Sequence, residues 1–176
     1  MGELEMKKIL PYGVLVLGVI LCLYSPITKW TAQQNTHENV FAQEDSIGKI
    51  EISIIDVNLP IYKGTEEEVL QKGIGCMEKA SPLGSGKSAH SILAGHRGLP
   101  HAELFLRLDE LEEGDCFTLH VEEKELVYEV CSIQVIRPSE TEIFRVQKGR
   151  DLVSLVTCTP YGINTHRLVV MGERKD

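Results

Sequence analysis

The protein has 176 residues, 43% of which are hydrophobic, and a formal net charge of −8 at pH 7. This length and composition are typical of one globular domain. The first thirty residues hold few charges, so the remainder carries 15 basic and 24 acidic residues. An acidic surface repels phosphate, and we therefore expect no nucleic-acid partner.

The N-terminal part of the sequence is predicted to cross a membrane. Residues 9–28 contain no charged side chain, and a helix of about twenty residues spans a hydrocarbon core. Lys7 and Lys8 favour a cytoplasmic location for residues 1–8. No small-x-small cleavage site follows the apolar run, so we expect an uncleaved signal anchor in the cell membrane, with the rest of the chain outside the cell. Residues 29–46 are polar and are interpreted as a linker.

Residues 47–176 show the apolar pattern of short strands. Runs of alternating or continuous apolar residues are separated by glycine, proline and other turn formers. Many short strands with few helices are typical of a small closed β-barrel, and we predict one such domain here. The eight predicted strands are residues 50–56, 59–62, 73–80, 89–95, 116–121, 126–136, 151–157 and 168–171.

Two short helices are predicted between these strands. Residues 65–71 form the first, with Thr65 as N-cap and Glu68 three residues later, and the acidic run 66–68 is interpreted as a solvated face. Residues 100–111 form the second, which is amphipathic. Its apolar face consists of Leu104, Phe105 and Leu108.

Four of the five cysteines show no pattern that predicts chemistry. Their spacing contains no C-x-x-C or Cys/His arrangement, so we expect no metal ion and no other cofactor. Cys22 falls in the predicted membrane segment. Cys76, Cys116 and Cys131 are interpreted as small buried hydrophobic residues, with a Cys116–Cys131 disulfide bridge as the alternative.

Cys158 is different because it comes where the strand 151–157 ends. A loop of turn formers follows, and Arg167 stands at the start of the next strand, 168–171. A hairpin-like return would bring the thiol and the guanidinium together, and a permanent cation favours the nucleophilic thiolate. The alternative is a half-buried structural cysteine.

His96 also lies at the end of a predicted strand, 89–95, and is followed by Arg97 and Gly98. Together with Cys158 and Arg167 it could form a cysteine–histidine nucleophile pair with an electrophilic helper.

The other five histidines compete for this role. His37 lies in the linker, and His90, His101 and His120 fall in segments where we expect exposure. His166, beside the arginine, is the main rival, with support of its loop as the alternative role.

These segments resemble the sortases, membrane-anchored cysteine transpeptidases of Gram-positive bacteria. Residues 154–158, Ser-Leu-Val-Thr-Cys, are similar to the Thr-Leu-x-Thr-Cys signature of the family. Residues 94–97, Ala-Gly-His-Arg, resemble its histidine segment, and Arg167 stands at the family's arginine. The resemblance extends from about Ile47 to Gly172 and implies the eight-stranded sortase barrel.

Within the family, residues 95–100 and 157–167 resemble class C, the branch that polymerises pilins. Two features depart from that class. Class C enzymes usually carry an Asp-Pro-aromatic lid, whereas residues 31–49 contain no proline, so we expect no lid. They also usually carry a second, C-terminal membrane helix, whereas the given sequence ends at Asp176.

The resemblance implies a mechanism. Cys158 would attack the Thr–Gly carbonyl of an LPXTG-like sorting signal, and His96 would act as acid and then as base. Arg167 would hydrogen-bond the peptide carbonyl or the developing oxyanion. On weaker grounds, the substrate groove would be lined by Thr157, Leu99 and Pro100.

Three functions stay open at this point. The first is pilus assembly, in which a pilin lysine is the attacking amine. The second is the anchoring of surface proteins to the peptidoglycan cross-bridge. The third is a catalytically inactive, anchored barrel that only binds surface proteins.

Overall fold

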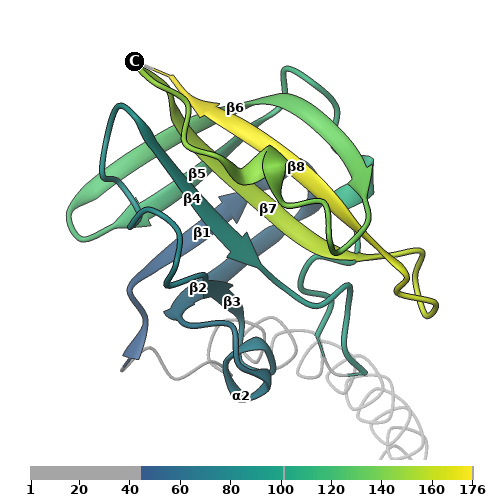
Figure 1. The fold of residues 1–176 in the computed structure, drawn as a ribbon. Coiled ribbons are helices and arrows are strands. Elements are labelled where there is room, and N and C mark those ends of the chain that lie inside the picture. The colour runs from purple at the N-terminus through teal and green to yellow at the C-terminus, as the bar shows by residue number, and fades with distance from the viewer. Residues whose placement is uncertain (1–44, 101, 176) are drawn as a thin grey trace, which may run out of the picture. The chain divides into compact units, whose positions relative to one another are not determined.

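Eight strands close into a barrel in the described part of the chain (Figure 1). The computed structural model describes residues 45–100 and 102–175, all within one compact unit that spans residues 43–176. Around the barrel the strand order is β1, β2, β3, β4, β7, β8, β6 and β5, and β5 pairs with β1. The bounds are β1 Gly48–Ile52, β2 Val57–Lys63, β3 Ile74–Cys76, β4 Ala89–Ala94, β5 Cys116–Val121, β6 Lys124–Ile136, β7 Asp151–Thr159 and β8 His166–Arg174.

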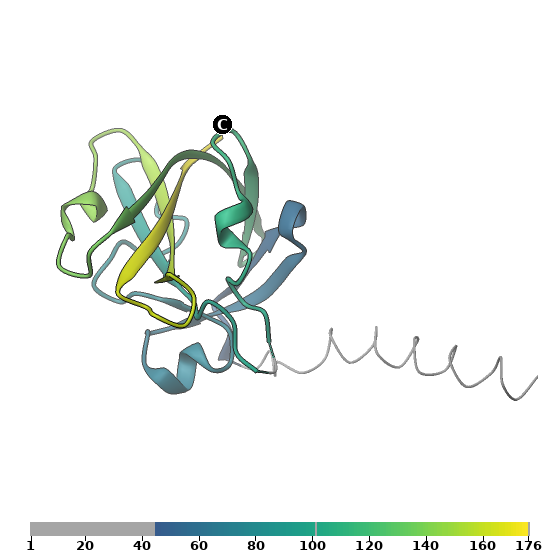
Figure 2. The ribbon, with the colours of Figure 1, turned by 90° about the vertical axis from the view of Figure 1, so that its right-hand side faces the viewer.

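Two neighbouring pairs run parallel, β2 with β3 and β4 with β7, and the other neighbours run antiparallel. A parallel pair needs a crossover connection. The first crossover contains the short helix α2, Glu67–Leu70, and the second contains β5 and β6. β8 lies between β7 and β6 (Figure 2). Closure leaves no strand without a partner on either side, so the barrel has no free edge.

The period-two alternation of each strand separates the barrel interior from its outer surface. On β7, Val153 and Leu155 belong to the core cluster, so Ser154, Val156 and Cys158 face outward. The neighbouring strands follow the same rule. Their core members are Leu93 on β4 and Leu168 and Val170 on β8.

The predicted barrel of eight strands is confirmed, and the strand bounds differ from the predicted ones by a few residues. β3 is shorter than predicted, with 3 residues where the pattern predicted residues 73–80, and β8 is longer, with 9 residues where it predicted residues 168–171. The predicted helix cap is wrong: the residue before α2 is Glu66, and no side chain caps this helix.

The helix predicted over residues 100–111 is also wrong, although its apolar residues are buried. Leu104 and Phe105 are 3% and 0% exposed, but Leu104 has φ = 42°, in the left-handed region that an α-helix excludes. Only a 3-10 turn, η3 Leu108–Glu110, follows. Residues 102–111 are therefore an irregular segment that packs its apolar side chains on the core.

The four cysteines in the described part of the chain are free thiols. Cys76 is buried as predicted, but Cys116 is exposed, which corrects its assignment to the interior. Cys116 pairs with Glu129 across β5 and β6, so it does not lie opposite Cys131, and the alternative disulfide does not form.

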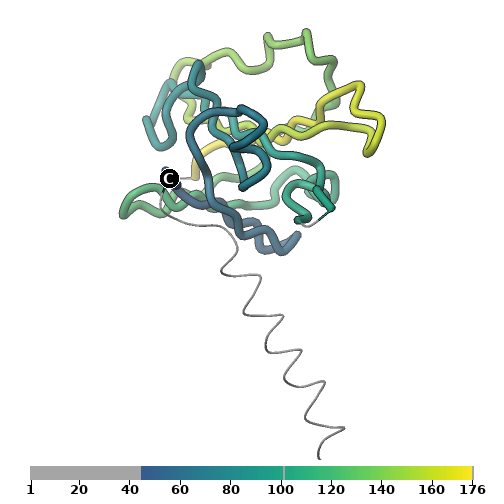
Figure 3. The backbone as a smooth tube through the Cα atoms, turned by 90° about the horizontal axis from the view of Figure 1, so that it is seen from below, coloured from purple at the N-terminus to yellow at the C-terminus, as the bar shows by residue number. Residues whose placement is uncertain are grey.

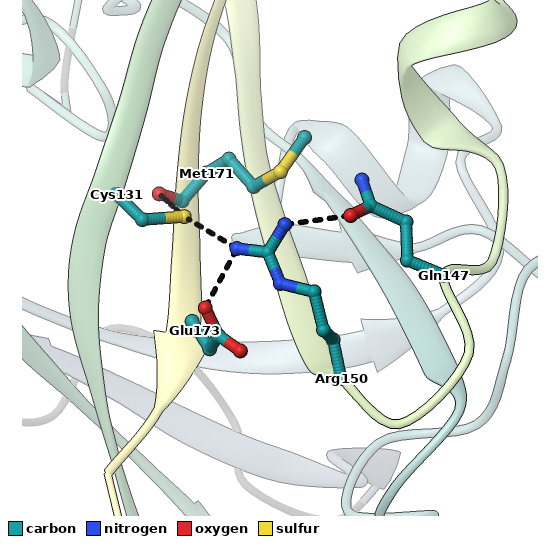
Figure 4. Close-up of polar contacts among 5 residues, drawn as sticks. All are labelled: Cys131, Gln147, Arg150, Met171 and Glu173. Atoms are coloured by element: carbon teal, nitrogen blue, oxygen red, sulfur yellow. Dashed lines mark hydrogen bonds and ion pairs between the residues drawn. The ribbon is translucent and has the colours of Figure 1, made fainter.

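Arg150 fastens the β6–β7 segment, residues 137–150, to the outside of the barrel (Figure 4). Its Nη2 lies 2.6 Å from Glu173 Oε2 and 3.6 Å from Cys131 Sγ, and its Nη1 lies 2.6 Å from Gln147 Oε1. Burial raises the pKa of the Cys131 thiol, and the nearby guanidinium offsets this only in part. Cys131 is therefore a structural thiol.

The β6–β7 segment forms the light green arch in Figure 3. It contacts His90 through the carbonyl oxygen of Arg145 and the ring of Phe144. His90 is 1% exposed, which corrects the expectation of an exposed residue. Its Nδ1 lies 3.2 Å from the carbonyl oxygen of Arg145, and its Nε2 lies 2.8 Å from Ser154 Oγ. A carbonyl oxygen only accepts, so Nδ1 carries the proton and Nε2 accepts from the serine. Burial lowers the pKa of this imidazole.

In the described residues no helix is both long and apolar enough to cross a membrane. The predicted membrane segment, residues 9–28, lies outside the described residues and stays a prediction. The same holds for nearly all of the linker, residues 29–46.

We expect the free energy of unfolding to fall as the pH is lowered from about 7 to 5, and to fall less in a His90→Gln variant. The folded-state pKa of His90 lies below its ordinary value of 6.5, so the unfolded chain binds this proton more readily. The stabilisation is present above pH 6.5 and is lost as the pH falls through the folded-state pKa, by at most about 1.4 kcal/mol per pH unit. Denaturant titrations at several pH values measure both slopes, and equal slopes would contradict this assignment.

Candidate active site

Cys158 and Arg167 lie directly opposite each other on β7 and β8. Opposed residues of an antiparallel pair place their side chains on the same face, with Cβ atoms about 5 Å apart. Both residues are half-buried. The β7–β8 turn therefore brings the thiol and the guanidinium together on the outer surface, as the sequence predicted.

The parallel pairing of β4 with β7 brings His96 to the same place. Ala94 is in register with Val156, and the backbone N–H of Gly95 donates to the carbonyl oxygen of Val156 at 3.0 Å. Continuing this register by two residues puts His96 level with Cys158. Because Leu93 faces the core, His96 faces outward, like Cys158.

Two side-chain hydrogen bonds hold the segment after β4 against the end of β7. Thr157 Oγ1 donates to the carbonyl oxygen of Gly95 at 2.9 Å, and Arg97 Nη1 donates to Thr159 Oγ1 at 2.7 Å. The first bond joins the residues just before His96 and Cys158 in sequence, and the second joins the residues just after them. Arg97 Nη2 also donates to Asp109 Oδ2 at 2.5 Å, which ties the same segment to η3.

Arg167 is oriented by the turn that precedes it. Its Nη1 donates to the carbonyl oxygens of Asn164, at 3.1 Å, and of His166, at 3.0 Å. Among the described residues, no protein partner of Nε or Nη2 is found. The guanidinium is thus fixed by one nitrogen and can offer the other two to a ligand.

His166 lies beside Arg167 but faces the other way. It shares its strand parity with Leu168 and Val170, which face the core, and it is in register with Thr159 rather than Cys158. Its Nδ1 lies 2.9 Å from Thr165 Oγ1. The alternation therefore separates this histidine from the thiol and favours His96 as the partner of Cys158.

Comparison with known proteins shows the family of this chain. A family model described as the Sortase domain matches residues 50–175. The chain belongs to the sortase family. Sortases are cysteine transpeptidases, so the chain belongs to a family of enzymes that use a cysteine nucleophile.

The individual relatives are sortases of several types. Sortase A of Bacillus anthracis is 31% identical over 127 residues, which cover 72% of this chain and 59% of that protein. The chain thus spans less than two thirds of that relative's length. The solved structure of Streptococcus pneumoniae sortase C is 45% identical with a TM-score of 0.75, covering 78% of this chain and 73% of that one. Sortase C-1 from Actinomyces oris is 45% identical with a TM-score of 0.74, covering 76% of each chain.

Of the three residues predicted to line the sortase groove, Thr157 is placed elsewhere. It is 2% exposed, and its hydroxyl is bonded to Gly95. Its side chain faces the interior because strand alternation puts Cys158 outside, so the assignment as a groove residue is corrected. Leu99 is half-buried and Pro100 is exposed, and their predicted role stays a prediction.

Sequence reasoning missed Glu67. This residue was interpreted as part of a solvated face, and its side chain is indeed 67% exposed, yet its Oε1 lies 3.2 Å from His96 Nε2. The sequence contains no signal for this contact, because the crossover between β2 and β3 brings α2 to the end of β4. In the described residues no group of three His, Cys, Asp or Glu side chains could hold a metal ion.

A hollow of about 420 Å³ lies further back along the outer surface of β4. It is lined by Ile92, by Met77 after β3, and by Phe144 and Val146 of the β6–β7 segment. Cys158 is not part of its lining. The β6–β7 segment thus covers the surface near the start of β4, and the sortase thiol lies at the other end of the parallel pair.

We expect a Thr157→Val variant to lose stability without losing affinity for substrate. Valine has nearly the same shape but leaves the carbonyl of Gly95 without its donor, which costs about 1 kcal/mol. The apparent Tm should fall and the KM for a sorting-signal peptide should stay unchanged. A raised KM at unchanged Tm would instead restore Thr157 as a groove residue.

Proposed function

We propose that this sortase cleaves an LPXTG-like sorting signal through a thioacyl-enzyme and transfers the protein to a pilin lysine. What supports the proposal is the strand register, which sets Arg167 opposite Cys158 and places the end of β4, two residues before His96, beside Val156. These three residues have the catalytic roles.

We also propose that residues 9–28 anchor the enzyme in the cell membrane, with the barrel on the extracellular side.

In the first step the Cys158 thiolate attacks the carbonyl carbon of the Thr–Gly bond. The carbon–nitrogen bond breaks, and His96 gives its proton to the leaving glycine amine. In the second step an incoming amine attacks the thioester, His96 takes a proton from it, and the thiolate leaves. The covalent intermediate retains the acyl group until the second amine arrives.

Arg167 supplies positive charge where the oxyanion develops. Its Nη1 is held by two carbonyl oxygens of the turn, so the planar guanidinium is oriented before the substrate binds. Lysine would not replace it equally well, because its donors share one nitrogen on a flexible stem, whereas the rigid guanidinium bonds the turn with one nitrogen and directs the others to the substrate.

The substrate peptide would lie along the outer surface of β4 and β7. The apolar part of the hollow, with Ile92, Phe144 and Val146, suits the leucine and proline of the signal. The threonine carbonyl would then reach Cys158 at the other end of the strands.

A pilin lysine is the preferred acceptor because of the similarity to sortases C. The solved structure of Streptococcus pneumoniae sortase C was described as giving insight into pilin substrate specificity, and it is 45% identical to this chain. One sequence feature favours anchoring to the cross-bridge instead. Streptococcus agalactiae sortase C1 has been crystallised as a lid mutant and therefore has a lid, whereas residues 31–49 of this chain contain no proline and so lack the Asp-Pro-aromatic lid motif. An inactive barrel is disfavoured because all three residues of the site are intact.

We expect the wild type to form a thioester with a sorting-signal peptide and to join pilin subunits into covalent multimers, and Cys158→Ala to do neither. The substitution removes the nucleophile from the outer surface, where packing demands are low. Mass spectrometry of the trapped enzyme and denaturing gels of the pilin products measure the two outcomes. A parallel reaction offers a cross-bridge peptide as acceptor. Products with that peptide alone would favour anchoring, and a turnover-competent Cys158→Ala would refute the nucleophile.

We expect His96→Ala to lower the rate of peptide cleavage about a hundredfold to ten-thousandfold, the usual loss for a positioned acid–base group. His166→Ala should have a far smaller effect, because its side chain faces away from Cys158. Both variants are compared with the wild type in one cleavage assay. Equal losses, or a larger loss for His166→Ala, would mean that the roles are reversed.

A further inference from the structure

A carboxylate from another part of the barrel contacts the proposed acid–base group. Glu67 Oε1, on α2, lies 3.2 Å from His96 Nε2, with the imidazole 27% exposed. The two neighbouring acidic residues of the run, Glu66 and Glu68, are also exposed, but the contact is made by Glu67. The position of Glu67 on the helix, rather than its charge or exposure, therefore explains the contact with His96.

The carboxylate of Glu67 is itself held in place. Gln71 Nε2, one helical turn further on, donates to the same Oε1 at 2.6 Å. This hydrogen bond, together with the neighbouring imidazole, lowers the pKa of the carboxyl group. Glu67 is thus ionised at neutral pH, and its oxygen accepts from two nitrogen donors.

The backbone that carries α2 is fixed against β3. Gly75 of β3 approaches the loop before α2 so closely that a Cβ there would clash with the carbonyl oxygen of Gly64 and crowd Leu70. β3 is in turn paired with β4, Gly75 with Ala94. The carboxylate is therefore held next to the strand end that carries the imidazole.

The contact determines which ring nitrogen takes part in proton transfer. An ionised carboxylate only accepts, so Nε2 of His96 carries a proton, and Nδ1 is the nitrogen left to give or take one. A carboxylate in this position also fixes the plane of the ring, as the third member of a nucleophile–base–carboxylate triad does.

We propose that Glu67 is a positioning residue that holds His96 in the Nε2–H tautomer, with Nδ1 directed to proton transfer. This inference rests on the proposed roles of Cys158 and His96. Because the pair is partly exposed, the effect is modest, and we expect a change in rate of about two- to fivefold. Burial of the site by bound peptide strengthens the pair.

The test uses three variants of the full chain. Glu67→Leu removes the acceptor, Glu67→Gln removes the charge but keeps an oxygen, and Glu68→Leu is the matched control on the same helical turn. Long-range ¹H–¹⁵N NMR of histidine-labelled protein identifies the tautomer of His96, assigned by the signal lost in His96→Gln. We expect the Nε2–H tautomer in the wild type and in Glu68→Leu, and a mixture of tautomers in Glu67→Leu.

Peptide cleavage gives the second readout. We expect kcat to fall about two- to fivefold in Glu67→Leu, less in Glu67→Gln, and not at all in Glu68→Leu, with KM and Tm unchanged. Wild-type tautomer and kcat in Glu67→Leu would overturn the proposal, as would equal losses in Glu68→Leu. A wild type that does not cleave the peptide would overturn the proposed function, while a tautomer change in Glu67→Leu would still support the contact.

Discussion

β4 and β7 run parallel and are in register from Ala89 with Asp151 to Ala94 with Val156. This pairing carries His96 and Cys158 past the end of the ladder at the same level and on the same face. A shift by one residue would turn one of the two side chains into the barrel interior. β8 then returns beside β7, with Arg167 opposite Cys158. The position of all three residues therefore follows from backbone hydrogen bonds.

Barrel closure makes this register rigid. β4 is held on its other side by β3, and β8 is held by β6, so neither neighbour of the parallel pair can slide without breaking the next ladder. Side-chain bonds reinforce the same end of the barrel: Thr157 binds Gly95 from the inside, and Arg97 binds Thr159. A nucleophile and an acid–base group on separate segments need such support, because an error of about 1 Å in their geometry lowers the rate strongly.

The outer surface of β4 has a covered end, at His90, and a partly exposed end, near His96. Both face outward from β4 or its continuation, yet His90 is buried under the β6–β7 segment while His96 is left partly exposed. Burial keeps the first imidazole neutral and bonded to Arg145 and Ser154. The second imidazole lies partly exposed, with Glu67 beside it. The same residue type thus has a structural role at one end of β4, and the proposed acid–base role belongs to the histidine at the other end.

The sequence by itself determined the features that depend on local pattern. Alternation of apolar residues predicted the eight strands, and the short turn after Cys158 predicted its meeting with Arg167, because a hairpin joins neighbours in sequence. The resemblance to sortases selected His96 as the acid–base candidate among the six histidines. Only the tertiary structure decided which outward positions are covered and which distant side chains meet. It buried His90, exposed Cys116, turned Thr157 inward and placed Glu67 against His96. These outcomes depend on crossover segments and strand register, and long-range packing of this kind leaves no periodic signal in the residues involved.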